Sequence, residues 1–587
     1  MDSVDDLVRK WAARTPDAVA VIGPDGALTY AELVDRADAL AERLRRAGAA
    51  PETPVLLCLP RSAALVIGAL GVLTAGAPYA PVDPAHPVLR LRSTVADSGA
   101  TILVRAPGGL RAPAGVTEID LTADQFVHSG LSSAVRHHEN SLAYVIHTSG
   151  SSGRPKSVQV DHAGLRHLVD WHHRAFALSS ADRVAQIAGP GFDAAVWETW
   201  AALTAGASLH VPDEETRLSP TALRDWLSRE GITTAFAPTA LAESLMALDW
   251  PADTPLRTLL TGGEALLRRP PPGLPFAVVN NYGLTEAVVV STTGHVRPGV
   301  GTPTIGTPVD HADVHIVDED LHPVPGGTAG ELLLGGPALA RGYAGQPALT
   351  ASRFVPDHLG GRPGTRLLRT GDRVRRGPDG ELEFLGRVDD QISLNGYRIE
   401  PAEVAAALTA HPAVRSAVVV PEPGRPTTPR LIAYLVSEGD PPGEEELVAF
   451  VADRLPAPMV PGGYVWLTEF PLSPNGKVNR AELPPAPAPG RNPGLGGELE
   501  ATLVPMVADV LQLPTVAVDE DFFRLGGHSL LGAQLVMRLQ ERFGVDMTLR
   551  FLFAHPTVSR MAAGIEAMLL DEVEALSEDE AAGSDRP

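Results

Sequence analysis

Short apolar runs alternate with helical hydrophobic patterns over roughly the first two thirds of the chain. A helical pattern at 28–44, for example, is followed by the strand-like run 55–59. Such alternation is typical of layered α/β architectures, in which helices cover a sheet. We therefore expect residues 1–385 to form a large layered α/β unit. Residues 386–484 carry fewer periodic pieces and are expected to form a small α+β unit.

A stretch rich in Pro, Gly and Ala at 485–497 follows these units. This composition cannot pack a core and behaves as a semi-stiff linker. Beyond it, residues 498–570 place apolar side chains at helical spacing, which predicts a small helical bundle. Residues 571–587 hold seven acids and one arginine, and we expect a disordered acidic tail.

The composition excludes several classes of function. The chain has 71 Asp and Glu against 48 Lys and Arg, a formal charge of -23, which argues against a nucleic-acid surface. Its one cysteine, Cys58, excludes a disulfide framework and a cysteine metal cluster. The first ten residues lack the apolar core of a signal peptide. Glycines and prolines interrupt the apolar stretch 63–82, so we expect a buried helix, no membrane span and a cytoplasmic protein.

One loop carries a phosphate-binding composition. Residues 148–156 read TSGSSGRPK and follow a strand-like run at 142–146. Backbone amides freed by glycine, hydroxyl groups and a cation can cradle a phosphate, although a flexible turn is the alternative. A Walker A loop is excluded because Pro155 stands where that motif needs glycine. Lysine occurs only at positions 10, 156 and 477, so Lys156 is retained in a chain that otherwise uses arginine.

The loop resembles the phosphate loop of the adenylate-forming (ANL) enzyme superfamily, specifically of nonribosomal peptide synthetase adenylation domains. Further motifs follow in the family's order and spacing: LTYAEL at 28–33, LTAGAPYAPVD at 73–83, NYGLTE at 281–286, the stretch 330–343, RTGD at 369–372, the stretch 386–400 and NGK at 475–477. The resemblance thus covers nearly the whole chain. It implies that residues 1–385 and 386–484 are the large and small subdomains of an adenylation domain that uses Mg²⁺ and ATP.

The resemblance also implies roles for individual residues. Tyr282 would stack on adenine, Glu286 would hold Mg²⁺, and Asp372 would accept the ribose hydroxyls. Lys477 would lie between the substrate carboxylate and the α-phosphate. Lys477, Lys156 and Glu286 are the expected catalytic residues. The full expected ATP-binding set is Thr148, Ser149, Gly150, Ser151, Ser152, Gly153, Lys156, Asn281, Tyr282, Gly283, Thr285, Asp372, Arg387 and Lys477. Asp389 would be the hinge about which the small subdomain rotates. From the residues alone, Glu286 could be a surface acid, Asp372 a turn former and Lys477 a solvated turn lysine.

Alignment through these motifs implies an amino-acid pocket. Its members are Asp193, Ala194, Trp197, Phe236, Leu260, Gly262, Asn281, Val289 and Val290, together with Lys477. Asp193 would bind the α-ammonium group, although an Asp here could also be a helix N-cap. The remaining wall is apolar, so it favours an aliphatic side chain, and the set resembles the leucine-selecting one. Isoleucine and valine remain possible substrates, because a difference of one methylene or of branch position changes the binding free energy by only about 1–3 kcal/mol.

The bundle at 498–570 contains the sequence DFFRLGGHSL at 521–530. It resembles the peptidyl carrier signature, which implies a four-helix-bundle carrier whose Ser529 receives 4'-phosphopantetheine from a phosphopantetheinyl transferase. A phosphodiester at a helix N-terminus is stabilised by free amides. Without the resemblance, Ser529 would read as a helix N-cap.

The expected function is therefore an adenylation–carrier didomain that activates leucine as aminoacyl-AMP and loads it as a thioester. No condensation or thioesterase motif is present, which leaves peptide joining to downstream condensation or tailoring enzymes. Whether an MbtH-like helper protein is needed stays open. The rival functions are an acyl-CoA or fatty-acyl-AMP ligase on the same fold, and a catalytically silent carrier or docking protein.

Overall fold

The structure is a computed structural model in which the positions of most residues are described. For residues 481, 529, 530 and 571–583 it describes the backbone alone. The described residues are 2–122, 135, 137–150, 155–360, 363–389, 391–394, 397–422, 430–471, 478–486, 497–545 and 547–583.

The chain divides into two compact units. The first consists of Met1–Asp213 and Thr221–Glu403, and the second of Glu214–Pro220 and Val404–Pro587. The boundary expected at 385/386 instead falls inside strand β21 (Leu382–Arg387). This strand pairs with β20 (Arg366–Arg376), and that ladder of backbone hydrogen bonds holds the residues beyond 385 in the first unit.

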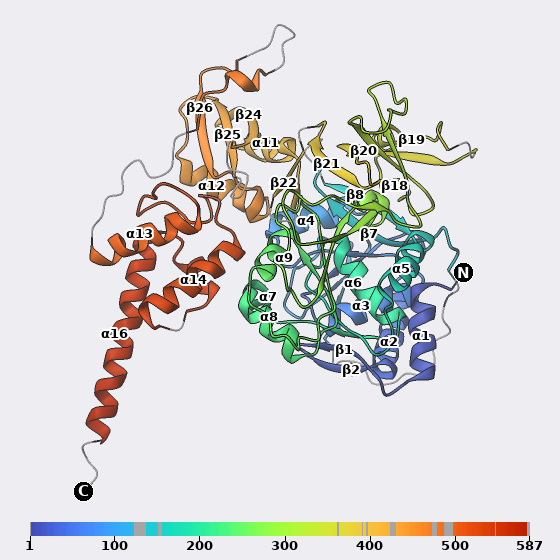
Figure 1. The fold of residues 1–587 in the computed structure, drawn as a ribbon, viewed down its shortest axis with the longest axis horizontal. Helices are drawn as coiled ribbons and strands as arrows, with labels where there is room; N and C mark the ends of the chain where they lie inside the picture. The colour runs from blue at the N-terminus through green and yellow to red at the C-terminus, as the bar shows by residue number, and fades with distance from the viewer. Residues whose placement is uncertain are drawn as a thin grey trace. The chain divides into compact units, whose positions relative to one another are not determined.

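Two large sheets dominate the first unit (Figure 1). The nine-stranded sheet has the order β15 (Thr307–Pro308), β14 (Thr292–Val296), β13 (Ala277–Tyr282), β12 (Thr258–Gly262), β11 (Thr234–Pro238), β9 (Arg183–Ala185), β10 (Ser208–His210), β1 (Val19–Gly23) and β2 (Gly26–Thr29). The seven-stranded sheet has the order β18 (Gly342–Tyr343), β8 (Lys156–Asp161), β7 (Leu142–Thr148), β4 (Tyr79–Pro81), β3 (Val55–Cys58), β5 (Ile102–Arg105) and β6 (Thr117–Asp120). The strands from β1 to β13 in the first sheet pair in parallel, which is typical of sheets covered by helices.

In the part of the chain that the structure describes, helices of the first unit pack with the sheets around three separate hydrophobic cores, of which the largest excludes α4, α8 and α9. The helices are α1 (Val4–Arg14), α2 (Tyr30–Arg46), α3 (Ala63–Ala75), α4 (Val88–Asp97), α5 (His162–Phe176), α6 (Asp193–Thr204), α8 (Pro220–Arg229), α9 (Thr239–Met246) and α10 (Pro347–Arg353). Every residue of α3 is buried, as expected for a helix that is apolar all round. Gly71 lets α3 approach α2, because an added Cβ would lie 2.8 Å from the Leu40 side chain. None of the described helices is long and apolar enough to span a bilayer.

Two small sheets complete the first unit. One has the order β16 (Asp313–Val317), β17 (Gly330–Gly335), β20 and β19 (Phe354–Pro356), with β21 paired to β20. The other is the hairpin of β22 (Ile392–Leu394) and β23 (Tyr397–Ile399).

The second unit holds a three-stranded sheet and a helical bundle. The sheet is β24 (Val414–Pro421), β25 (Leu431–Ser437) and β26 (Gly463–Leu467), accompanied by α11 (Pro401–Thr409) and α12 (Glu444–Ala452). The bundle is α13 (Glu498–Val510), α14 (Ser529–Phe543), α15 (Leu549–Ala554) and α16 (Val558–Gly583), and its core includes Leu503, Leu535, Leu552 and Ile565. The short helix α7 (Glu214–Leu218) also belongs to this unit. The expected fold class, a large α/β part, a small α+β part and a four-helix bundle, is confirmed.

The acidic end of the chain differs from the expected disordered tail. Helix α16 continues through 571–583, and Figure 1 shows it extending beyond the other helices of the bundle. Ala, Leu and Glu dominate this stretch and are strong helix formers, so helix propensity outweighs the repulsion among its acids. Most of the expected linker at 485–497 lies outside the described residues.

Candidate active site

The expected phosphate loop joins two antiparallel strands. Strand β7 ends at Thr148 and β8 begins at Lys156, and these two residues are paired in register. The loop residues Ser151, Ser152 and Gly153 lie outside the described residues. The described part still places the Lys156 ammonium in a buried position at the start of β8.

Lys156 belongs to a buried network of charges. Its ammonium donates to Oε1 of Glu400 at 3.0 Å, and Gln391 donates to the same oxygen at 2.6 Å. The Arg398 guanidinium contacts Gln391 and also donates to Oε2 of Glu286 at 2.9 Å. The two groups expected to meet ATP and its metal, Lys156 and Glu286, are therefore each paired with a residue of the 391–400 segment.

Glu286 is the buried carboxylate of this network. It lies in the 3₁₀ turn Thr285–Ala287, is 1% exposed, and accepts a hydrogen bond from the Tyr343 hydroxyl at 2.8 Å. Burial alone would raise the pKa of Glu286, but Arg398 and Lys156 lower it to about 2. Burial and the charge of Arg398 lower the pKa of Lys156.

The donor chemistry of Glu286 fits Mg²⁺, which prefers carboxylate oxygens and completes its shell with water and phosphate oxygens. Among the described residues, no group of three or more His, Cys, Asp and Glu side chains is arranged to hold a metal ion. A single carboxylate is consistent with a metal that is bound largely through nucleotide phosphates.

A second carboxylate cluster lies beside this network. The Tyr282 hydroxyl, at the end of β13, donates to Asp372 Oδ2 at 2.6 Å, and Arg387 donates to Asp372 Oδ1 at 2.5 Å. Arg387 also donates to Asp389 at 2.6 Å, and Asp389 accepts from Arg353 at 3.1 Å. Three expected ATP-binding residues, on β13, β20 and β21, are thus brought together with the expected hinge residue.

The turn after Tyr282 is strained. Val288 and Val289 have φ values of 53° and 69°, a left-handed conformation that β-branched residues rarely adopt. Gly283 lies against this turn, because a Cβ there would overlap the Val289 carbonyl oxygen. Such strain persists only when its surroundings hold it, and it often marks functional sites.

The expected pocket residues come from adjacent elements. Asp193 and Trp197 are four residues apart on α6 and therefore share a face. Phe236 on β11 is opposite Leu260 on β12, and the rings of Trp197 and Phe236 are 5.8 Å apart. On the next pair of strands Gly262 is opposite Asn281, where a Cβ on Gly262 would overlap the Asn281 carbonyl oxygen.

Asp193 links this pocket to the charged network. The N-cap of α6 is Phe192, so Asp193 is the first residue of the helix rather than its cap. Its carboxylate accepts a hydrogen bond from the Thr285 side chain, the neighbour of Glu286. Burial raises the pKa of Asp193 to about 6. A carboxylate in this setting gains most from a cationic partner.

Besides the loop residues 151–153, two further expected site residues are described only in part or not at all. Lys477 lies outside the described residues, so its role stays a prediction. Ser529 is the first residue of α14, and only its backbone is described. The preceding residue, His528, is the N-cap and makes no side-chain capping bond. The backbone amides of the first turn are therefore available to donate hydrogen bonds to a phosphodiester on Ser529.

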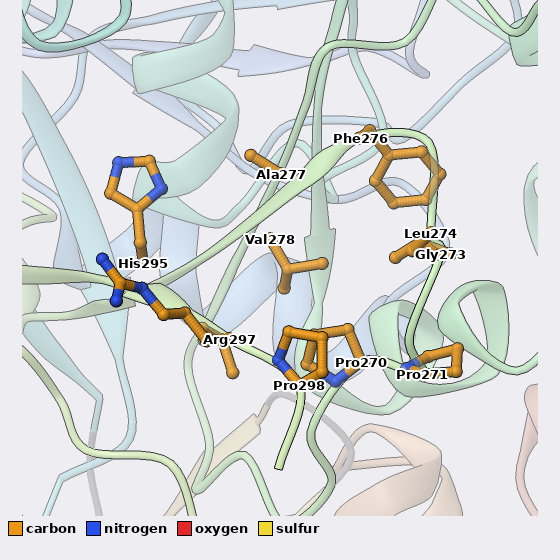
Figure 2. A pocket seen from close by; sticks show the side chains of 11 residues that line it. Pro270, Pro271, Gly273, Leu274, Phe276, Ala277, Val278, His295, Arg297 and Pro298 are labelled. Carbon is orange, nitrogen blue, oxygen red and sulfur yellow. The ribbon is translucent and has the colours of Figure 1, made fainter.

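A surface cavity of about 370 Å³ lies elsewhere in the first unit. Figure 2 shows its lining by Leu274, Phe276, Val278, His295 and Arg297, with prolines 270, 271 and 298. Val278 is near the start of β13, whereas the site residues Asn281 and Tyr282 are at its end. Ligands of open α/β sheets bind outside the carboxyl ends of the strands, so we assign no function to this cavity.

Sequence reasoning missed several members of the network. Gln391, Arg398 and Glu400 lie inside the motif stretch 386–400, and Tyr343 ends the stretch 330–343, but nothing in the sequence indicated their partners. His172 and His311, which contact the pocket residues Trp197 and Val290, were also missed and carry no motif signal.

Comparisons with known proteins agree with this geometry. Residues 8–344 match the AMP-binding enzyme family, residues 403–477 the AMP-binding enzyme C-terminal domain, and residues 501–565 the phosphopantetheine attachment site. The chain belongs to the AMP-binding enzyme family. The family implies ATP and Mg²⁺, and the attachment-site domain implies covalent 4'-phosphopantetheine.

The relatives are more specific about the kind of enzyme. The chain is 42% identical over 575 residues to a linear gramicidin synthase of Brevibacillus parabrevis, an alignment that covers 96% of this chain and 7% of the relative. It is 39% identical over 619 residues to phosphinothricin tripeptide synthetase PhsB of Streptomyces viridochromogenes, covering 99% of this chain and 51% of the relative. The chain therefore spans about half of one relative and a small part of the other.

A solved structure shares the same order of domains. Holo-PA1221, an NRPS protein containing adenylation and PCP domains, is similar with a TM-score of 0.78 and 25% identity, covering 96% of this chain and 97% of that one. The fold is thus that of a nonribosomal peptide synthetase adenylation–carrier didomain.

Proposed function

We propose that the protein activates an amino acid, with leucine as the preferred substrate, as its adenylate and loads it onto its own carrier domain. The observation that carries this proposal is the position of Asp193. Its carboxylate is hydrogen-bonded to Thr285, next to the metal-binding candidate Glu286. An acid beside a phosphate-handling site supports recognition of an α-ammonium group close to the carboxylate that reacts.

The chain's own residues bind and orient the reactants. Asp193 pairs with the ammonium group and Asp372 accepts the ribose hydroxyls beside Tyr282. Lys156, once released from Glu400, balances phosphate charge, and Glu286, once released from Arg398, would hold Mg²⁺, which would offset further phosphate charge. The substrate carboxylate then attacks the α-phosphorus and the bond to pyrophosphate breaks. This step depends on positioning and electrostatics. Lys477 is proposed to offset the charge that develops at phosphorus.

The carrier step depends on Ser529. When attached there, 4'-phosphopantetheine would supply a thiol, and transfer of the amino acid from the adenylate to that sulfur would break the acyl–phosphate bond and release AMP. The position of Ser529 at the first turn of α14 supports its assignment as the attachment site. A phosphopantetheinyl transferase is required to attach the group, and downstream condensation or tailoring enzymes are proposed to collect the product.

The apolar wall supports an aliphatic substrate. Trp197, Phe236, Leu260 and the two valines offer no partner for a charged side chain, and burying an unpaired charge is costly. ATP–pyrophosphate exchange measured over the amino acids tests the assignment, with the highest kcat/KM expected for leucine. Exchange with fatty acids alone would overturn it in favour of the acyl ligase. Intact-protein mass spectrometry after treatment with a phosphopantetheinyl transferase should show one added group, which Ser529→Ala removes.

A further inference from the structure

The indole of Trp197 is held by a residue outside the expected pocket set. Its Nε1–H donates to Nδ1 of His172 at 3.1 Å, and both side chains are buried, at 2% exposure each. An indole N–H is only a donor, and buried Trp side chains require an acceptor. His172 lies on α5, whereas Trp197 lies on α6, so the bond fixes the ring against a neighbouring helix.

The geometry defines the chemical state of His172. Its Nδ1 accepts a hydrogen bond, so the ring proton is on Nε2, a buried atom without a hydrogen-bond partner among the described residues. Burial lowers the pKa of His172 to about 3, which keeps the ring neutral. The imidazole stands nearly perpendicular to the indole, with an interplanar angle of 87° and ring centroids 5.4 Å apart. A neutral ring in one tautomer is a fixed acceptor rather than a proton carrier.

A second contact supports the opposite part of the wall. His311 contacts the Val290 carbonyl oxygen through Nε2 at 3.1 Å, directly after the strained Val288–Val289 turn. Trp171 lies between the two contacts, 6.3 Å from Trp197 and 6.0 Å from His311 between ring centroids. A layer formed by His172, Trp171 and His311 therefore backs two expected pocket residues that are distant in the sequence.

We propose that His172 is a positioning residue that sets amino-acid specificity by fixing the plane of the Trp197 indole. This inference rests on the proposed function, because it assumes that Trp197 lines the amino-acid pocket. With its N–H bonded to Nδ1, the indole is held in one orientation, tilted by 59° against the Phe236 ring, and cannot rotate to enlarge or fill the space beside Asp193. The wall then discriminates between aliphatic side chains by shape.

Three substitutions separate the acceptor from the bulk of the ring. His172→Leu removes the acceptor. His172→Asn retains an acceptor oxygen two bonds from Cβ, in the place of Nδ1. His172→Gln keeps polarity but moves its oxygen one bond further out. His173→Leu is the matched control, because His173 is the next residue of α5 and contacts the Ala201 carbonyl oxygen, one turn further along α6, instead of an expected pocket residue.

The measurement is ATP–pyrophosphate exchange with leucine, isoleucine, valine, methionine and phenylalanine. His172→Leu is expected to lower the kcat/KM ratio of the preferred amino acid over its best competitor about 10-fold, mainly through KM for the amino acid. KM for ATP should not change. His172→Asn and His173→Leu should keep the wild-type ratio, and His172→Gln should behave like His172→Leu. In a Trp197→Phe background, which lacks the N–H, adding His172→Leu should change the ratio no further.

The following results would overturn the proposed role of His172. An unchanged ratio in folded His172→Leu overturns it, as does equal loss in His172→Asn and His172→Gln. If His172→Leu does not fold, the comparison of the Asn and Gln variants gives the answer. Wild-type protein that exchanges no amino acid overturns the proposed function and this inference together. Wild-type protein that selects one amino acid, with variants that select it equally well, overturns this inference alone.

Discussion

The Lys156 ammonium lies 3.0 Å from Oε1 of Glu400, and the two side chains are only 3% and 9% exposed. Arg398 pairs with Glu286 in the same network, at 2.9 Å. Each charged group expected to meet the ATP phosphates or their metal thus has an internal counter-ion. If these groups bind Mg²⁺ and ATP as proposed, the ligands must compete with Glu400 and Arg398 for them.

Glu400→Gln is expected to tighten ATP binding. Without the carboxylate, a larger fraction of the protein presents a free Lys156, and the KM for ATP should fall by about 3- to 10-fold in exchange assays. The unfolding temperature should fall, because a buried ammonium loses its partner. Glu422→Gln is the matched control, since Glu422 forms a similarly buried pair with Arg430 beside the three-stranded sheet of the second unit, outside the network. A rise in the KM for ATP would contradict this account.

Lys156→Ala is expected to remove most adenylation. Loss of the cation that is proposed to balance the phosphate charge should reduce kcat/KM for ATP by about 10²-fold. Lys10→Ala provides the control, because Lys10 forms an exposed pair with Asp2, and such surface pairs contribute little. Exchange assays on both variants give the comparison, and equal activity would remove Lys156 from the mechanism.

Asp193 predicts a pH dependence of amino-acid use. Its pKa is raised to about 6, so the free protein loses the carboxylate charge as the pH falls below 6. We expect kcat/KM for leucine to fall below that pH with a slope of one, because kcat/KM reports groups of the free protein. A profile that stays flat from pH 7 to 5 would exclude Asp193 as the ammonium partner.

Asp193 is also expected to affect stability, with a pH dependence opposite to that of amino-acid use. Its folded-state pKa lies above the ordinary Asp value of 3.8, so the folded protein binds the proton more tightly than the unfolded chain does. The Asp193 contribution to stability is therefore greatest at low pH and is lost as the pH rises from about 4 through 6. Asp193→Asn should raise the unfolding free energy at pH 7 by about 1 kcal/mol while abolishing amino-acid binding. Thermal unfolding at pH 7 tests the expected gain in stability, and exchange assays on the same preparation test the loss of amino-acid binding. A lower unfolding temperature for Asp193→Asn would contradict the expected gain in stability.

Gly283→Ala is expected to disrupt the strained turn. The new Cβ would overlap the Val289 carbonyl oxygen, so the turn must move. We expect a loss of about 2–3 kcal/mol in unfolding free energy and weaker amino-acid binding. Gly326→Ala is the control, because nothing lies within 4 Å of a Cβ at that position among the described residues. Chemical unfolding of the two variants measures the difference.

Local patterns predicted the elements well where apolar spacing is strong. The helix at 63–75, the strand at 142–148 and the bundle helices α13 and α14 lie where their patterns indicate. Two boundaries were wrong for different reasons. The first unit extends past 385 because a strand ladder, which depends on a distant partner, continues there. The tail beyond 570 is helical because helix propensity outweighed the acidic composition used to predict disorder.

The sequence by itself determined which chemical groups are available: a hydroxyl- and glycine-rich loop ending in Lys156, a carboxylate at 286, another at 372, and a serine at the start of a carrier helix. These signals are local, because glycine, turn and capping preferences act over a few residues. Only the tertiary structure decided which side chains meet. The pairs Lys156–Glu400 and Arg398–Glu286, and the bond from Trp197 to His172, join residues that are between 25 and 244 positions apart. Their partners are selected by burial, since a charge or an N–H removed from water must find a complement wherever the fold places one.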